Sequence, residues 1–190
     1  MDSEFGLHPE AIPGAPELLR WVTTLRLPAV GRLREAPDGL GELLASGVLS
    51  EVLVENNALW TRLPGADWAT HGVRVRDAIT TAARDLTSWQ VEAADDELLA
   101  LVAGDVIDRT LGAYIASHGG QITLLSAADG QVRVALEGAC AGCPAAGLTL
   151  HGRIQKSIRA RLGEHIEVQD ASPRRGRPRL LSVTRPVRPG

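Results

Sequence analysis

A strand, a glycine-rich loop with two cysteines and the start of a helix follow one another in residues 131–144, which read QVRVALEGACAGCP. Apolar and polar residues alternate in the first half of this segment, as expected for a strand with one buried face. Pro144 suits the first turn of a helix, because the N–H that proline lacks is one that the helix would leave unbonded. The segment therefore predicts a strand that passes through a cysteine loop directly into a helix.

That strand is predicted to be the second half of a β-hairpin. Asp129-Gly130 precedes it and favours a tight turn, because glycine accepts a positive φ, and residues 122–126 supply the first strand. Ahead of the hairpin, apolar residues recur at steps of three and four over residues 96–117, which predicts a helix. The glycine pair at 119–120 ends this helix, since glycine tolerates the left-handed conformation past a helix terminus.

A second amphipathic helix is predicted after the cysteine loop, because four aliphatic residues recur there at strict four-residue steps. These residues are Leu150, Ile154, Ile158 and Leu162. Residues 166–168 then alternate as a last short strand. Residues 96–170 are therefore predicted to fold in the order α-β-β-α-β, with the helices packed on a three-stranded sheet.

The rest of the chain predicts a second, smaller unit and two irregular ends. Residues 17–91 are expected to form a small α/β domain, in which four scattered tryptophans pack in the core and His71 stands alone. Its predicted strands are 18–27, 48–54 and 58–63, with a turn at Asn56-Asn57, and its predicted helices are 38–45 and 73–86. An acidic stretch at 92–96 separates the two domains, so the fold class is α/β in the broad sense, that is α+β.

Both ends of the chain are predicted to be irregular. Residues 1–16 are rich in proline and glycine and are expected to form a flexible arm. Residues 171–190 combine repeated proline with six arginines and no acid, which predicts a disordered tail. The tail could aid solubility or contact a partner or a nucleic acid through its arginines.

Composition places the protein among ordinary globular chains, with 44% hydrophobic residues, 23% charged residues and a net charge of -3. We see no apolar run of about 18 residues and no signal or transit peptide in the first ten residues, so we expect a cytoplasmic protein without a membrane partner. The negative net charge makes nucleic acid an unexpected partner.

The chemistry is concentrated in Cys140 and Cys143, the only cysteines of the chain. In a reducing cytosol, closely spaced thiols favour metal binding or catalysis over a structural disulfide. Their place at a helix N-terminus favours the thiolate, which is the form that binds metal. Thiol–disulfide exchange of the thioredoxin kind and an incidental structural pair are the alternatives, although thioredoxin-like proteins alternate β and α where this chain has a hairpin.

The number of cysteines in one chain limits the kind of metal centre that the chain can bind alone. Iron–sulfur clusters usually take four thiolates and zinc takes four ligands, whereas one chain offers two cysteines. A homodimer that shares one cluster would supply four. Such a cluster would be released easily, because separation of the protomers opens its ligand sphere.

An ordered set of residues around the loop resembles the C-terminal domain of NifU, the Nfu-type iron–sulfur cluster domain. The set comprises His118-Gly119-Gly120-Gln121, the hairpin, the run LEGACAGCP at 136–144, and Leu148-Thr149-Leu150. The resemblance implies a scaffold or carrier, not an enzyme, that binds a [4Fe–4S] cluster, or in some members a [2Fe–2S] cluster, between two protomers. It implies that Cys140 and Cys143 are the ligands, and that the partners are apo iron–sulfur proteins and the assembly machinery.

The chain departs from this family at one motif. Where the family commonly has Asp-Gly-Gly-Asp, residues 118–121 are His-Gly-Gly-Gln, which removes two negative charges and bears on partner contact. His118 and His151 are expected to be surface or packing residues and not ligands. The first domain resembles the Nfu N-terminal domain through residues 47–54, the asparagine turn and Asp67-Trp68.

Two other functions stay open on the residues alone. A thioredoxin-like oxidoreductase that cycles Cys140 and Cys143 would be a colourless monomer with disulfide reductase activity. A zinc-bridged structural dimer would contain zinc and have no visible absorption.

Overall fold

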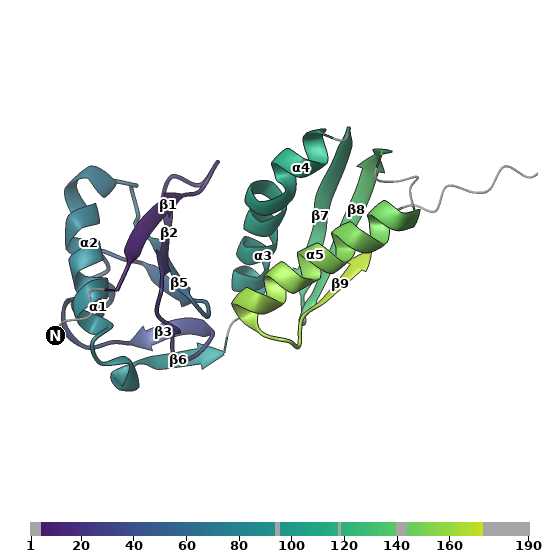
Figure 1. Cartoon of the computed structure of the whole chain (residues 1–190). Coiled ribbons are helices and arrows are strands. Elements are labelled where there is room, and N and C mark those ends of the chain that lie inside the picture. Colours follow the sequence, from purple (N-terminus) through teal and green to yellow (C-terminus); the bar gives the residue numbers. More distant parts are fainter. Residues whose placement is uncertain (1–4, 94–95, 118, 140–143, 173–190) are drawn as a thin grey trace, which may run out of the picture.

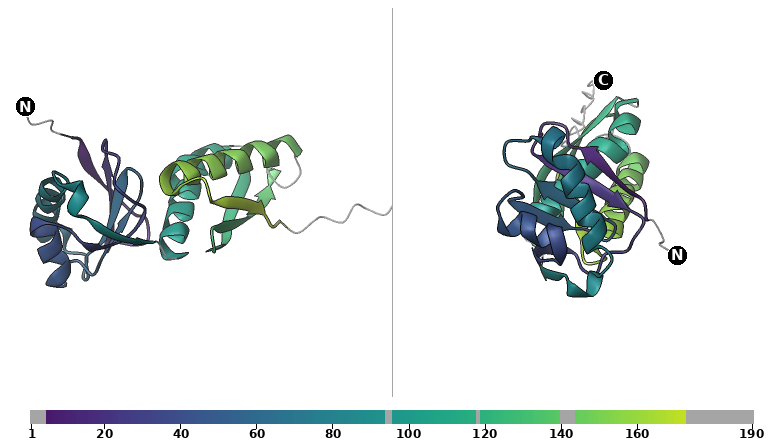
Figure 2. Two further views of the ribbon diagram at one scale, coloured as in Figure 1. Left: turned by 90° about the horizontal axis from the view of Figure 1, so that it is seen from below. Right: turned by 90° about the vertical axis from the view of Figure 1, so that its left-hand side faces the viewer.

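The computed structural model describes residues 5–93, 96–117, 119–139 and 144–172. They form two lobes that lie end to end (Figures 1 and 2), and we refer to residues 5–93 as the N-lobe and to residues 96–172 as the C-lobe. Each lobe has one sheet with helices on one of its faces. Among the described residues, no helix combines the length and the apolarity that a bilayer span requires.

The N-lobe is built on a six-stranded sheet whose pairs are all antiparallel, in the order β1-β2-β5-β4-β3-β6. The strands are β1 (Leu7–Ala11), β2 (Leu18–Thr23), β3 (Gly31–Glu35), β4 (Glu51–Val54), β5 (Ala58–Arg62) and β6 (Gln90–Ala93). Helices α1 (Asp38–Ala45) and α2 (Trp68–Ala82) lie side by side against the sheet, and a 3₁₀ turn, η1 (Leu86–Ser88), leads into β6.

The expectation that residues 1–16 are irregular is wrong for β1. This strand pairs with β2 along its whole length, from Leu7 opposite Thr23 to Ala11 opposite Leu19. Pro9 does not prevent pairing because β1 is an edge strand, where the missing N–H can face away from the ladder. Strands β3 and β6 were not predicted from the sequence either.

Helix α2 begins five residues before the predicted start at residue 73. Asp67 precedes its first residue and accepts a hydrogen bond from the backbone N–H of Thr70 at 3.2 Å, which satisfies one of the free donors of the first turn. The tryptophans pack as expected: Trp21, Trp60 and Trp89 are buried. Trp68 meets Trp21 edge to face, with ring centroids 6.5 Å apart.

The C-lobe has the predicted order of elements. A helical segment comprises α3 (Asp96–Asp105), a π-helical stretch η2 (Val106–Leu111) and α4 (Gly112–Ser117); then come β7 (Gly120–Ala128), β8 (Gln131–Gly138), α5 (Pro144–Leu162) and β9 (Glu167–Asp170). Strand β8 is central, antiparallel to β7 and parallel to β9. The mixed fold class and the three-stranded sheet are therefore confirmed.

Helices α3 and α5 cover the same face of this sheet. Ile154, Ile158 and Leu162 of the predicted stripe are buried, and they pack with Leu98 and Val102 of α3. On β8 the alternating residues Val132, Val134 and Leu136 point into the same core. The period-two and period-four patterns of the sequence thus meet in one hydrophobic cluster.

The two lobes share part of that cluster. Leu53 of β4 and Trp60 of β5 belong to the same group of buried residues as the core of the C-lobe. Asn56, in the turn between these strands, donates from its backbone N–H to the carbonyl oxygen of Arg161 and from its side chain to that of Ala160, each at 2.9 Å. The N-lobe therefore caps the C-terminus of α5, where a helix leaves its last carbonyl groups unbonded.

Candidate metal centre

The entrance to the cysteine loop is formed by two glycine segments that lie against each other. Gly120 and Gly138 are the last paired residues of the β7–β8 hairpin. One residue further, the N–H of Ala139 donates to the carbonyl oxygen of Gly119 at 3.1 Å. The chain enters the loop from a fixed position, because strand pairing continues up to the residue before Cys140.

Gly138 is the residue whose identity this arrangement requires. Its φ is +63°, in the left-handed region that favours glycine. A Cβ at this position would lie 2.3 Å from the carbonyl oxygen of Gly119, which is far inside van der Waals contact. The glycine at position 138 therefore permits the close approach of two backbone segments.

Cys140 and Cys143, the predicted ligands, lie outside the described residues, as does His118. Their predicted roles therefore stay predictions. The structure does describe the residues on both sides of the cysteines, Ala139 and Pro144. These fix where the loop begins and ends.

The loop leads directly into α5, which begins at Pro144 as predicted and runs to Leu162. Cys143 is therefore the residue before a 19-residue helix. The free N–H groups and the positive end of the dipole at such a helix start favour a thiolate over a thiol. This end of α5 is suited chemically to hold an anionic ligand, and the opposite end is held by the N-lobe.

No second metal site is evident in the part of the chain that the structure describes. No group of three or more His, Cys, Asp or Glu side chains is placed there to bind a metal ion. His71 lies on α2, and the side chain of His151 is outside the described part. Cys140 and Cys143 thus stay the candidate ligands.

The largest feature that the sequence analysis missed is a closed ring of alternating charges between the lobes. Three acids and three arginines form it, and we call it the six-charge ring. Around the ring the pairs are Glu10–Arg20 (2.9 Å), Arg20–Glu55 (3.0 Å), Glu55–Arg161 (2.7 Å), Arg161–Asp105 (2.7 Å), Asp105–Arg109 (2.9 Å) and Arg109–Glu10 (3.0 Å). Three members come from each lobe, so the ring ties α3, η2 and α5 to the N-lobe.

Glu55 is the centre of this ring and has no exposed side-chain surface. Arg161 donates to both of its carboxylate oxygens at 2.7 Å, and Arg20 donates to both at 3.0 and 3.1 Å. The indole N–H of Trp60 is a fifth donor. Two bidentate arginines match the geometry of a carboxylate and satisfy its lone pairs, which is the condition for burying such a charge.

The electrostatics of the ring follow from these contacts. Burial alone would raise the pKa of Glu55, but the hydrogen bonds from Arg161 and Arg20 outweigh it, so the pKa lies below its ordinary value. Burial alone would lower the pKa of Arg20, and the bonds to Glu55 raise it above its ordinary value. Both groups are therefore charged at neutral pH. The one cue in the sequence is that Glu55 directly follows three apolar strand residues and precedes the Asn56-Asn57 turn, and it does not identify the partners of Glu55.

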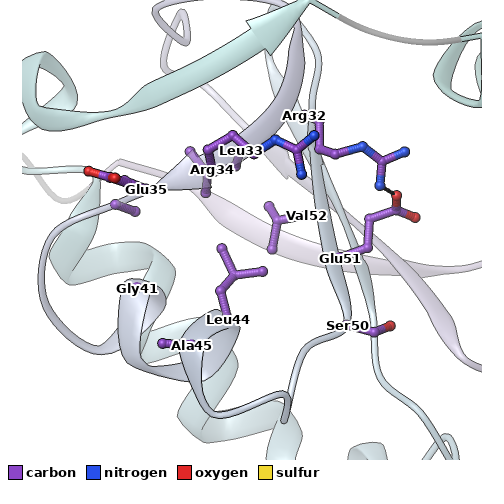
Figure 3. Close-up of a pocket in the computed structure, with 11 residues that line it drawn as sticks. Arg32, Leu33, Arg34, Glu35, Gly41, Leu44, Ala45, Ser50, Glu51 and Val52 are labelled. Carbon is purple, nitrogen blue, oxygen red and sulfur yellow. Dashed lines mark ion pairs between the residues drawn. The ribbon is translucent and has the colours of Figure 1, made fainter.

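A pocket in the N-lobe is separate from the cysteine loop. It has a volume of about 510 Å³ and lies between β3, β4 and α1 (Figure 3). Strands β3 and β4 pair only at Gly31–Val54 and Arg32–Leu53 and then diverge around it. An ion pair between Arg32 and Glu51 lies at its side. Among the described residues that line it there is no cysteine or histidine, so it adds no ligand to the candidate centre.

Comparison with known proteins shows what most of the C-lobe is similar to. Residues 104–169 match the family model of the NifU-like domain. The relatives found include the Fe/S biogenesis protein NfuA of Xanthomonas oryzae pv. oryzae and that of Xanthomonas campestris pv. campestris, each 35% identical over 68 residues. The aligned part covers 35% of this chain and 34% of the relatives, so the chain spans about a third of their length. The resemblance to the NifU C-terminal domain is confirmed for residues 104–169.

Proposed function

We propose, on the premise of this NifU-like domain, that the protein is an iron–sulfur cluster scaffold or carrier with Cys140 and Cys143 as its cluster ligands. The observation that carries the proposal is that the matched residues, 104–169, include both cysteines of the chain. The relatives are named as Fe/S biogenesis proteins. The geometry around the loop supports the same chemistry, with a rigid strand end before it and a helix N-terminus after it.

The number of cysteine thiolates in each chain determines how the cluster would be bound. A [4Fe–4S] cluster, or a [2Fe–2S] cluster, takes four thiolates, so two protomers would each supply Cys140 and Cys143. The cluster in this scheme lies between two copies of the chain. Separation of the copies exposes the iron to incoming thiolates of an apo-protein, which accepts the cluster by ligand exchange.

The protein in this proposal acts by binding and delivery and not as an enzyme. Its partners are a second copy of itself, apo iron–sulfur proteins and the machinery that supplies clusters. A reducing compartment such as the cytoplasm would keep both thiols available for iron. We further propose that residues 17–91 and 96–170 are two domains, with the first related to the Nfu N-terminal domain.

Anaerobic reconstitution with iron and sulfide tests the proposal, on the wild type, Cys140→Ala, Cys143→Ala and the control His151→Ala. The wild type and the control should gain a broad absorption band near ~400 nm, typical of thiolate-ligated iron–sulfur centres, and should double in mass on sizing. Both cysteine variants should stay colourless monomers.

The same samples separate the two alternative functions. A colourless wild-type monomer that reduces protein disulfides would replace the carrier by a thioredoxin-like oxidoreductase. A colourless dimer that contains zinc after purification would replace it by a zinc-bridged structural dimer. Either result contradicts the cluster proposal.

A further inference from the structure

The end of β8 that enters the cysteine loop extends beyond its neighbour β9. Strand β9 pairs with β8 only as far as Val134, which lies opposite Asp170, so residues 135–138 have no strand on that side. On the other side, β7 continues to the pair Gly120–Gly138. Figure 1 shows that β8 ends at the end of the C-lobe that is farther from the N-lobe. Without a further contact, the strand end before the loop would be held from one side.

The two residues after β9 supply a contact on the other side. The N–H of Ala171 donates to the carbonyl oxygen of Val134 at 2.8 Å, which continues the ladder by one bond. The N–H of Leu136 then donates to the side-chain hydroxyl of Ser172 at 2.7 Å. The backbone of residue 136 is therefore bonded on the side that β9 does not reach, and a serine side chain takes the place of a backbone acceptor.

Asp170 fixes the direction of the Ser172 hydroxyl. Its Oδ1 accepts from the backbone N–H of Ser172 at 2.8 Å and from the hydroxyl at 2.5 Å. A hydroxyl has one hydrogen to donate, and a carboxylate is a stronger acceptor than the carbonyl oxygen of Leu136, which is 3.3 Å away. The hydroxyl therefore donates to Asp170 and accepts from Leu136. We call these contacts the Asp170–Ser172–Leu136 relay.

Leu136 connects the relay to the rest of the strand end. Its side chain is buried in the core of the C-lobe, and its backbone is paired with Ile122 of β7. Gly138, which contacts the backbone of Gly119, is two residues further along the strand. A displacement of Leu136 would therefore be passed to Gly138 and to the first residue of the loop.

We propose that Ser172 is a positioning residue for the cysteine loop, and that Asp170 orients its hydroxyl for this role. The inference rests on the proposed function, because it concerns the same two ligands, Cys140 and Cys143. A cluster bound between two copies is retained only while both loops present their thiolates together. Ser172 keeps the end of β8 in one place and thereby slows the release of the cluster.

Release of the reconstituted cluster to an iron chelator tests this role, measured as the decay of the absorption band at ~400 nm. In Ser172→Ala, release should be about tenfold faster than in the wild type, because a hydrogen bond of a charge-assisted relay is lost. Ser172→Thr keeps the hydroxyl and should release the cluster at the wild-type rate. Asp170→Asn keeps the shape of the side chain without its charge, and its rate should lie between those of the wild type and Ser172→Ala.

A matched control separates the position of the loop from the stability of the protein. Ser46→Ala also removes a serine hydroxyl with a 2.7 Å hydrogen bond, here to the carbonyl oxygen of Glu42 at the end of α1 in the N-lobe. Its rate of cluster release should equal that of the wild type, whatever its midpoint of urea unfolding.

A second measurement requires no cluster. In the apo-protein, the amide of Ala139 bonds to the carbonyl oxygen of Gly119 at the entrance to the loop. Its hydrogen exchange, measured by NMR, should be about tenfold faster in Ser172→Ala than in the wild type, because this bond opens more often when the strand end is loose. In Ser46→Ala it should be unchanged.

The outcomes distinguish this inference from the proposed function. A wild type that gains no absorption band would overturn the proposed function and, with it, the role of Ser172. A wild type that gains the band but releases the cluster as fast as Ser172→Ala would overturn the inference alone. Equal acceleration of release in Ser46→Ala would also overturn it, because the effect would then follow from lost stability.

Discussion

Gly138 connects the fold to the proposed chemistry at the scale of one residue. It is the last residue of β8, two positions before Cys140, and its backbone passes close to Gly119. The glycine pair after α4 and the glycine before the cysteines, which are far apart in sequence, are therefore one structural unit. The two backbones can approach each other because Gly138 has no side chain at this point, whereas a Cβ at Gly119 would meet no atom within 4 Å.

We predict that Gly138→Ala destabilises the protein and lowers cluster occupancy. The left-handed φ alone costs on the order of 1–2 kcal/mol, and the contact with the carbonyl oxygen of Gly119 forces the loop to move. Urea unfolding and the iron content after reconstitution measure the two effects. Gly130→Ala is the control, since Gly130 also has a left-handed φ but its added Cβ would be 3.7 Å from the nearest atom.

The two variants make the test specific. Gly130→Ala should show the cost of backbone strain with normal iron content. Equal iron content in both variants would show that the approach of Gly138 to Gly119 does not position the cysteines.

Glu55 matters for its side chain, whereas Gly138 matters because it has none. The carboxylate of Glu55 is a charge that is completely buried between the two lobes. Removal of one partner from a buried ion pair leaves the other charge unpaired, which typically costs about 3–5 kcal/mol. We predict a loss of this size at neutral pH for Glu55→Gln, measured by urea unfolding. Glu42→Gln, on the exposed face of α1, should change stability by less than about 0.5 kcal/mol.

The contribution of Glu55 to the free energy of unfolding should decrease as the pH falls. The pKa of Glu55 is lowered in the folded state from an ordinary value of 4.5. Its ion pairs therefore stabilise the fold above this value, and the contribution is lost as the pH falls through the folded pKa. The acid decline in stability below 4.5 should be steeper in the wild type than in Glu55→Gln, and parallel declines would contradict this.

At the scale of elements, α5 joins the candidate centre to the N-lobe. Its first residue follows Cys143, and its last turn is capped by Asn56 and carries Arg161. Arg161 lies outside the apolar stripe of the helix and also contacts the ring of Trp60, with 5.9 Å from the guanidinium carbon to the centroid. One side chain therefore makes the main polar contacts between α5 and the other lobe.

We predict that Arg161→Met loosens this end of α5. The variant keeps an unbranched side chain but leaves Glu55 with Arg20 as its one remaining arginine, so the amide protons of Asn56 and of the last helical turn should exchange at least about tenfold faster. Hydrogen exchange measured by NMR reports each amide. Lys156→Met on the exposed face of α5 is the control, and similar exchange in both variants would contradict the anchoring role of Arg161.

At the scale of the whole molecule, the shared core and the six-charge ring make the lobes mutually dependent. All four tryptophans lie between residues 21 and 89, so their fluorescence reports on the N-lobe and, through Trp60, on its contact with the C-lobe, whereas far-ultraviolet circular dichroism reports on both lobes. We predict that the two signals give coincident thermal transitions in the wild type, as expected for one cooperative unit.

Breaking the ring should separate the transitions. In Glu55→Gln, the fluorescence transition is expected to move away from the dichroism transition, while Glu42→Gln keeps them together. Two separate transitions in the wild type would show that the lobes are independent domains that only touch.

The sequence by itself determined the α-β-β-α-β order of the C-lobe, because each of its elements carries a local signal. Alternation marks β8, four-residue steps mark α5, and the residues Gly119, Gly120 and Pro144 mark element ends. The same local pattern led to the family resemblance. The π turn within the helix of residues 96–117 was not predicted, since an added residue hardly changes the apolar spacing.

Only the tertiary structure decided how the lobes are joined. Strand β1 was missed because pairing at a sheet edge depends on its neighbour β2 and not on its own proline-containing sequence. The six-charge ring was missed because its members lie up to 151 positions apart, from Glu10 to Arg161, and none has a periodic signal. A buried charge is stable only when the fold brings its partners together, so its role follows from three-dimensional proximity that no local pattern contains.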